Sequence, residues 1–98
     1  MSNFQGRYDH VLDLHGKTID EAIRDFDFLL NRASGQSILV IHGHGSGRLR
    51  DALRSFAKDH GLVESLRFGE DIMHELGSAA FIVETIDFSR PPSVKRGG

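Results

Sequence analysis

The hydrophobic residues of this chain follow two periods, one typical of strands and one typical of helices. Residues 8–14 alternate between apolar and polar side chains and then reach a glycine, which predicts a strand. Residues 38–41 are all apolar, as expected of a central strand covered on both faces. The segments 62–68 and 79–88 are predicted to be two further strands, joined by a polar loop over 69–78.

Two segments between these strands carry apolar residues at three- and four-residue steps, the period of an amphipathic helix. The first begins with a capping box made by Thr18 and Glu21 and closes near Gly35. The second is predicted at about residues 48–59, with Gly61 as its stop signal. The apolar positions of the first helix are Ile19, Ala22, Ile23, Phe26, Leu30 and Ala33.

The predicted order is therefore βαβαββ. A strand, a helix and a strand at this spacing favour a right-handed parallel crossover, which brings the carboxyl ends of the first two strands to one edge of the sheet. We predict an α/β (α+β sandwich) domain of two layers, a four-stranded mixed sheet and two helices, over residues 8–88. Residues 1–7 are expected to be an extension and residues 89–98 a flexible basic tail.

Composition narrows the classes of protein that this chain can belong to. With 98 residues it can form one modest core, and it has no apolar run near the roughly 20 residues that span a bilayer. No targeting pattern opens the sequence, so a cytoplasmic location is expected. The chain has no cysteine, which excludes disulfides, thiol nucleophiles and zinc sites that use cysteine.

The net charge of −2 counts against tight, non-specific binding to DNA. However, Arg48, Arg50 and Arg54 fall within seven residues, directly after a glycine-rich turn. The sequence therefore predicts a local basic face on a chain that is acidic as a whole.

Two motifs carry candidate chemistry, and both follow strands. In the first, Asp13 and His15 share one face of a strand end, where a carboxylate can fix the tautomer of an imidazole for acid-base catalysis. The alternative is that both side chains only hydrogen-bond the backbone of the turn.

The second motif is "HGHGSGR", residues 42–48, in which alternating glycines allow a sharp turn before a helix. The helix N-terminus can bind an anion, with Ser46 as N-cap or phosphate donor and Arg48 or Arg50 as a guanidinium fork. The glycine spacing matches neither a Walker A loop nor a dinucleotide fingerprint. A tight turn that exposes its histidines is the alternative reading.

Metal binding is a further reading, because His15, His42 and His44 beside Asp13 resemble a two-histidine, one-carboxylate set. The neighbouring arginines and helix N-terminus disfavour a dication, so we expect no metal and no cofactor. The remaining histidines, His10, His60 and His74, are expected to be solvated.

The pair of motifs, "LDLHG" and "HGHGSGRLR", resembles the Smr (small MutS-related) domain family over about residues 8–86. The resemblance implies a βαβαββ fold similar to the C-terminal domain of translation initiation factor three. It also implies nucleic-acid binding, and for many members endonuclease activity on DNA or RNA, some of it on ribosomes and some of it without a divalent metal. One departure is "LGSAAFIVET", where many relatives have a glycine-rich run, so the resemblance supplies no basis for a backbone contact from this segment.

The resulting hypothesis is a metal-independent endonuclease that prefers RNA. His15 would be the general base or acid, Asp13 would orient it, and His42 would be the complementary acid, base or oxyanion donor. The expected partners are RNA or DNA, with the ribosome and other domains of a larger protein as further candidates. The phosphate would be bound by Gly43, His44, Gly45, Ser46, Gly47, Arg48 and Arg50. Open alternatives are a binding module without catalysis, a DNA-nicking endonuclease and a small metal-dependent hydrolase.

Overall fold

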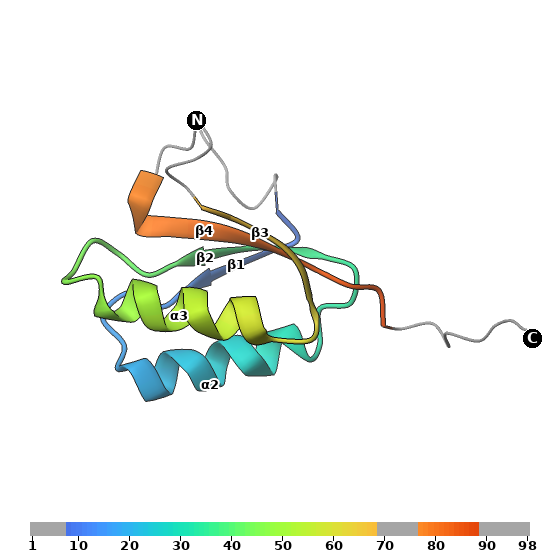
Figure 1. Cartoon of the computed structure of the whole chain (residues 1–98), viewed down its shortest axis with the longest axis horizontal. Coiled ribbons are helices and arrows are strands. Elements are labelled where there is room, and N and C mark those ends of the chain that lie inside the picture. Colours follow the sequence, from blue (N-terminus) through green and yellow to red (C-terminus); the bar gives the residue numbers. More distant parts are fainter. Residues whose placement is uncertain (1–7, 69–76, 89–98) are drawn as a thin grey trace, which may run out of the picture.

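A computed structural model of the chain describes residues 8–68 and 77–88, which form two layers. The sheet makes one layer, and both helices lie together against one of its faces (Figure 1). The expected extension 1–7, the expected tail 89–98 and residues 69–76 of the expected loop lie outside the described residues.

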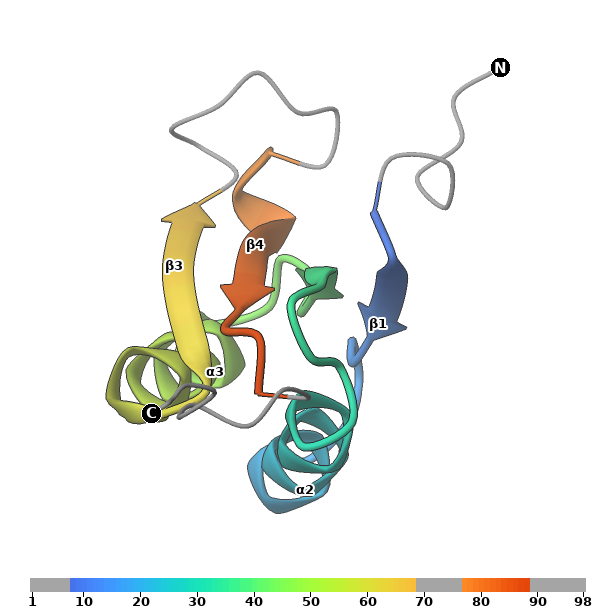
Figure 2. The same cartoon turned by 90° about the vertical axis from the view of Figure 1, so that its right-hand side faces the viewer.

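The sheet is mixed and four-stranded, as predicted. Its strand order is β1-β2-β4-β3, with β1 parallel to β2 and with β4 antiparallel to both of its neighbours. In Figure 2, β3 and β4 lie side by side and run in opposite directions, and β1 lies at the other edge of the sheet. The predicted parallel crossover between the first two strands is therefore confirmed. The strands are β1 (His10–Asp13), β2 (Ser37–Ile41), β3 (Val63–Phe68) and β4 (Ala80–Thr85).

The register of these strands brings three chain segments to one edge of the sheet. Asp13 at the end of β1 is paired with Ile41 at the end of β2, and Ile41 is also paired with Ala80 at the start of β4. The backbone N–H of Leu14 extends this pairing by donating to the carbonyl oxygen of Ile41 at 2.7 Å. The segments that follow β1 and β2 and the segment that precedes β4 therefore meet.

Helices α2 (Ile19–Leu30) and α3 (Arg48–Asp59) place their apolar faces on the sheet. Phe26 lies at the centre, with its ring centroid 5.8 Å from that of Phe56 and 6.1 Å from that of Phe81. No helix in the described part of the chain is both long and apolar enough to cross a membrane. The core between the sheet and the helices also contains Leu14, Ala22, Leu30, Ile38, Val40, Leu53, Ala57 and Val83.

Two histidines that we expected to be solvated have specific partners. The Nε2 of His60, at the end of α3, lies 2.9 Å from Asp27 on α2, and its Nδ1 accepts the N–H of Leu62. The ring also packs against Phe56 at 5.2 Å, and the side chain is only 15% exposed. His60 thus joins the two helices to the start of β3, a role that sequence spacing could not show.

His10 is the second correction, because it is half-buried and its Nε2 lies 2.7 Å from the Oε1 of Gln36. This contact joins the start of β1 to the turn before β2. His74, the third histidine of the group, lies outside the described residues.

The capping box at the start of α2 fixes the direction in which the chain leaves the end of β1. The N–H of Glu21 donates to the hydroxyl of Thr18, and the N–H of Thr18 donates to the Glu21 carboxylate, both at 3.1 Å. We expect Thr18→Ala to lower the free energy of unfolding by about 1 kcal/mol, because the N–H of Glu21 loses its hydroxyl acceptor. Urea denaturation measures the loss, and Thr18→Ser, which keeps the hydroxyl, is the control.

This cap also makes the stability depend on pH. Hydrogen bonds with Thr18 hold the pKa of Glu21 below its ordinary value of 4.5. Since the folded-state pKa is the lower one, the cap contributes fully above pH 4.5 and loses its contribution as the pH falls through the lowered value. The stability difference between wild type and Glu21→Gln should therefore narrow in acid, and a difference independent of pH would contradict this account.

Candidate active site

The three segments that meet at the sheet edge enclose a cleft of about 390 Å³. One wall is the turn between β1 and α2, and the other is the loop from β2 to the first turn of α3. The third contribution comes from η2 (Gly77–Ala79), a short 3-10 turn before β4. The lining residues are His15, Gly16, Lys17, His42, Gly43, His44, Gly45, Ser46, Gly47, Leu49, Arg50 and Ser78.

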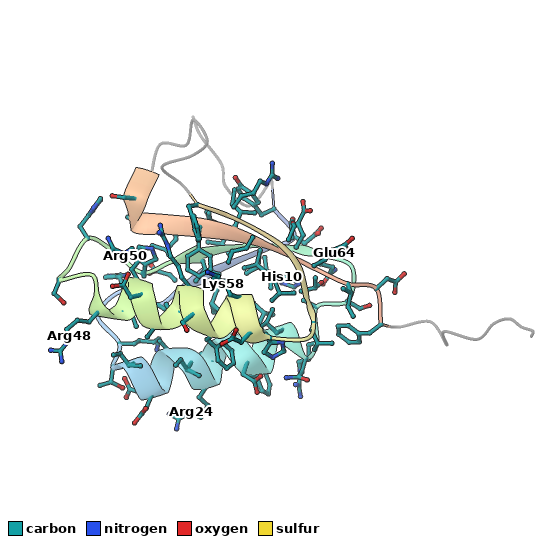
Figure 3. The ribbon with its side chains drawn as sticks, viewed as in Figure 1. His10, Arg24, Arg48, Arg50, Lys58 and Glu64 are labelled. Atoms are coloured by element: carbon teal, nitrogen blue, oxygen red, sulfur yellow. The ribbon has the colours of Figure 1, made fainter. Side chains whose placement is uncertain are left out.

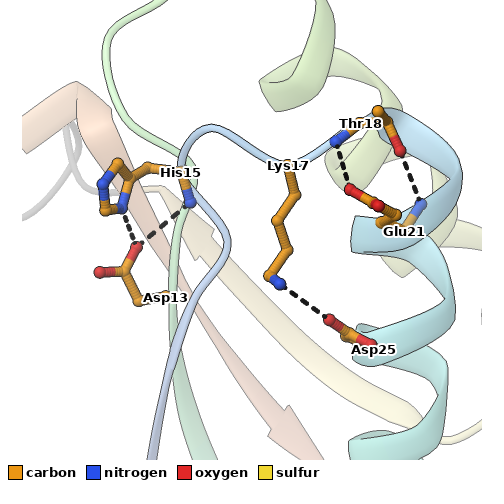
Figure 4. Close-up of polar contacts among 6 residues, drawn as sticks. All are labelled: Asp13, His15, Lys17, Thr18, Glu21 and Asp25. Carbon is orange, nitrogen blue, oxygen red and sulfur yellow. Dashed lines mark hydrogen bonds and ion pairs between the residues drawn. The ribbon is translucent and has the colours of Figure 1, made fainter.

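Asp13 and His15 form the pair that their spacing predicts. The Nδ1 of His15 lies 2.5 Å from Asp13 Oδ1, and the same oxygen accepts the backbone N–H of His15 at 3.2 Å (Figure 4). An ionised carboxylate only accepts hydrogen bonds, so the proton is on Nδ1 and Nε2 is the nitrogen that can exchange a proton with a substrate. The side chain of His15 is 68% exposed and lines the cleft, whereas Asp13 lies behind it.

The carboxylate of Asp13 is suited to an orienting role because it stays ionised. Partial burial acts to raise its pKa, but the side-chain and backbone hydrogen bonds from His15 outweigh this effect, with smaller attractions from His15 and Lys17. The net result is a pKa below the ordinary value of 3.8. Across the neutral range the carboxylate therefore keeps accepting the Nδ1 proton of His15.

His42 is held very differently from His15, because it is buried and only 5% exposed. Its ring lies over the core residue Phe81 at 5.8 Å, and its Nδ1 is 2.8 Å from the carbonyl oxygen of Gly43. Since a carbonyl only accepts, this nitrogen carries the proton, and Nε2 is enclosed by the surrounding protein. His42 thus joins the hydrophobic core to the glycine loop.

The glycine loop needs its glycines at specific positions. Gly43 and Gly47 have φ values of 83° and 94°, in the left-handed region that disfavours other residues. A Cβ on Gly43 would lie only 3.2 Å from the Cβ of His15, so the two walls of the cleft approach each other here. Gly45 has neither constraint, because no atom lies within 4 Å of a Cβ built there.

The N-cap of α3 is Gly47. Of the two roles that we predicted for Ser46, N-cap and phosphate donor, the first is wrong because its side chain does not cap the helix. Gly47 has a left-handed backbone conformation, which turns the chain between Ser46 and the helix. The Ser46 hydroxyl therefore makes only a long contact, accepting the N–H of Arg48 at 3.4 Å. No side-chain cap closes α3 in the described part of the chain, and Leu49 and Arg50 of its first turn line the cleft, so the positive end of this helix is available to an anion.

The two arginines that we predicted to bind phosphate are placed differently. Arg50 lines the cleft, with its Nε donating to Asp51 at 3.0 Å and its Nη2 close to Gly47, 2.8 Å from where a Cβ would be. Arg48 is exposed and projects outward from the start of α3, and it is not among the lining residues (Figure 3). A phosphate contact from Arg48 stays a prediction.

Sequence reasoning missed the contributions of Lys17, Ser78 and Ala79. The carbonyl oxygen of Ala79 accepts the N–H groups of His42 at 2.9 Å and Gly43 at 3.1 Å, which fixes the start of the glycine loop. Ser78 lines the cleft beside it. The contribution of Lys17 could have been predicted, because this residue directly follows the first motif. The position of η2 could not, because it depends on the order of the strands in the sheet.

Metal binding finds no ready ligand set among the side chains described. Over residues 8–68 and 77–88, no three His, Asp or Glu residues gather closely enough to hold a metal ion. His15 and His42 each direct one ring nitrogen to a protein oxygen, at 2.5 Å and 2.8 Å.

The fold and cleft define a class of small two-layer domains whose site lies where two parallel strands end. The chain belongs to the Smr domain family, whose model matches residues 12–85. The crystal structure of the Smr domain of Thermus thermophilus MutS2 agrees, with a TM-score of 0.69 and 30% identity, covering 84% of this chain and 99% of that chain. The resemblance and the two-layer α/β fold inferred from the two motifs are thereby confirmed.

Relatives of known name are much longer proteins. Endonuclease MutS2 of Caldicellulosiruptor saccharolyticus is 48% identical over 64 residues, which are 62% of this chain and 8% of that protein. Endonuclease MutS2 of Geobacillus kaustophilus is 36% identical over 90 residues, which are 86% of this chain and 11% of that protein. This chain thus corresponds to about a tenth of their length.

Proposed function

We propose that this domain binds nucleic acid and cleaves its phosphodiester backbone without a metal, with a preference for RNA. The observation that carries the proposal is the exposed His15 imidazole, which is oriented by Asp13 and lines the same cleft as Arg50 and the glycine loop. The endonuclease names of its MutS2 relatives support the same class of activity.

The simplest reaction for these groups is attack by the 2′-hydroxyl of RNA on the adjacent phosphorus. Nε2 of His15 accepts the hydroxyl proton, while the new P–O2′ bond forms and the P–O5′ bond breaks. A proton returns to the departing O5′, so the products are a 2′,3′-cyclic phosphate and a free 5′-hydroxyl. Asp13 stabilises the imidazolium that forms, because its carboxylate is already bound to Nδ1.

Negative charge builds up on the phosphate oxygens during this attack. The first-turn amides of α3 and the Arg50 guanidinium are the donors closest to that charge. His42 is the candidate to protonate O5′ or to donate to an oxyanion. Either role needs a proton on Nε2 in addition to the one on Nδ1, and a substrate oxygen that reaches this buried nitrogen. Its burial on Phe81 and its bond to Gly43 make it rigid, which suits a group that must keep a fixed position.

The test is incubation of the purified protein with end-labelled structured RNA, DNA of the same sequence and supercoiled plasmid, all in chelator. We expect RNA fragments that end in cyclic phosphate, and intact DNA. Nicked plasmid would instead support the DNA-nicking alternative. Activity that disappears in chelator and returns with one added metal would replace the proposal by a metal-dependent hydrolase.

A binding module without catalysis is the second candidate, and one observation favours it. The two cations that line the cleft are each paired with a carboxylate, and the net charge of the chain is −2. Such a module would retain labelled RNA in low salt, lose it steeply as salt rises and release no fragments. The ribosome remains a predicted partner under either candidate.

A further inference from the structure

The two cations that line the cleft, Lys17 and Arg50, both form ion pairs with carboxylates, and the catalytic proposal does not use these pairs. Lys17 Nζ lies 3.5 Å from Asp25 on α2, and Arg50 Nε lies 3.0 Å from Asp51 on α3. Figure 4 shows the Lys17 side chain running from the turn after His15 toward Asp25. Each wall of the cleft therefore carries a cation that is paired with a carboxylate. The carboxylate is on α2 for Lys17, and it is the next residue of α3 for Arg50.

The ion pairs of both cations are open to water. The pair of Arg50 with Asp51 joins side chains that are 38% and 70% exposed, and the Arg50 Nη2 would lie 2.8 Å from a Cβ on Gly47. Lys17 has one ion pair, and its side chain and that of Asp25 are 41% and 44% exposed. An exposed ion pair of this kind contributes little to stability, because water screens it and the long lysine side chain is mobile.

The backbone places Lys17 in the same cleft as His15. Gly16 has a φ of 80°, and the N–H of Lys17 donates to the Leu14 carbonyl at 3.2 Å, which closes the turn. Lys17 is therefore two residues from His15 and lines the same cleft. A strand of nucleic acid with its scissile phosphate at His15 brings a neighbouring phosphate within reach of this flexible ammonium group.

We propose that Lys17 is a substrate contact that binds a phosphate next to the scissile one, and that Asp25 competes with the substrate for it. The inference rests on the proposed function. RNA binding then exchanges the Asp25 carboxylate for a phosphate oxygen. The competition lowers the affinity for non-specific polyanions, while a correctly placed strand gains the contact.

The test measures the dissociation constant of an RNA oligomer with every 2′-hydroxyl methylated, which the proposed reaction cannot cut. Binding by wild type, Lys17→Ala, Asp25→Asn and the double variant is followed over a series of KCl concentrations. Asp20→Asn is the matched control, since it removes the same charge from an exposed position of the same helix.

We expect Lys17→Ala to weaken binding and to flatten the slope of log K against log salt by about 0.7, the value for one phosphate contact on a single strand. Asp25→Asn should tighten binding by about two- to fivefold, the range of an exposed ion pair. In the Lys17→Ala background that gain should shrink to the effect of Asp20→Asn.

Three results would overturn the inference. Binding with an unchanged salt slope in Lys17→Ala would remove Lys17 as a contact. A full Asp25→Asn gain without Lys17 would show a general charge effect in place of competition. No RNA binding by wild type would overturn this inference and the proposed function together.

A separate result concerns the catalytic role alone. Normal binding with cleavage unaffected by His15→Ala would refute the proposed role of His15 and leave the inference about Lys17 standing.

Discussion

His15→Ala should reduce RNA cleavage by about 10²- to 10⁴-fold, the usual contribution of a positioned acid or base. The loss should be in the chemical step, because the imidazole transfers the proton while Arg50 and the glycine loop hold the phosphate. His15 is 68% exposed, so its removal should leave the fold intact and cost little stability. Single-turnover cleavage with saturating protein separates the chemical step from binding.

The control for this variant is His10→Ala, which removes a histidine from the start of β1, outside the cleft. Asp13→Asn gives a second comparison, since the amide can still accept from Nδ1 but carries no charge to stabilise an imidazolium. It should lose less activity than His15→Ala. Unchanged cleavage in a folded His15→Ala protein would remove His15 from the reaction, whatever the other variants do.

Much of the fold could be predicted because local pattern and crossover rules agree. The capping box located the start of α2, and the parallel pairing of β1 with β2 followed from the strand, helix and strand spacing. That pairing brings the two motif-bearing turns to one edge of the sheet. The Asp13 to His15 contact followed from their positions on one strand end.

The rest of the site depends on long-range packing, which the periodicity of the chain does not contain. The strand order places η2 beside the glycine loop, where the Ala79 carbonyl binds two amides. The burial of His42 follows from its contact with Phe81, on a strand far along the chain. The same holds for His60, which pairs with Asp27 only because the two helices pack together.

Gly43→Ala should impair the site even though it removes no functional group. The left-handed φ of 83° costs a residue with a Cβ about 1–2 kcal/mol, and the new methyl group would lie 3.2 Å from His15. One of the two cleft walls must then move, and a displacement near 1 Å in an active site can cost about 10²-fold in rate. We expect cleavage to fall by about that factor, with a measurable loss in urea denaturation.

Gly45→Ala is the matched control for this prediction, because it adds the same methyl group two residues away in the same loop. Its φ is not left-handed, and no atom lies within 4 Å of the new Cβ. Its free energy of unfolding should stay within about 0.5 kcal/mol of wild type. If both variants lose activity equally, the glycines matter because any added methyl group in the loop occupies space that the substrate needs. If only Gly43→Ala does, the close approach of Gly43 to His15 sets the catalytic geometry, and this approach joins the two motifs in one site.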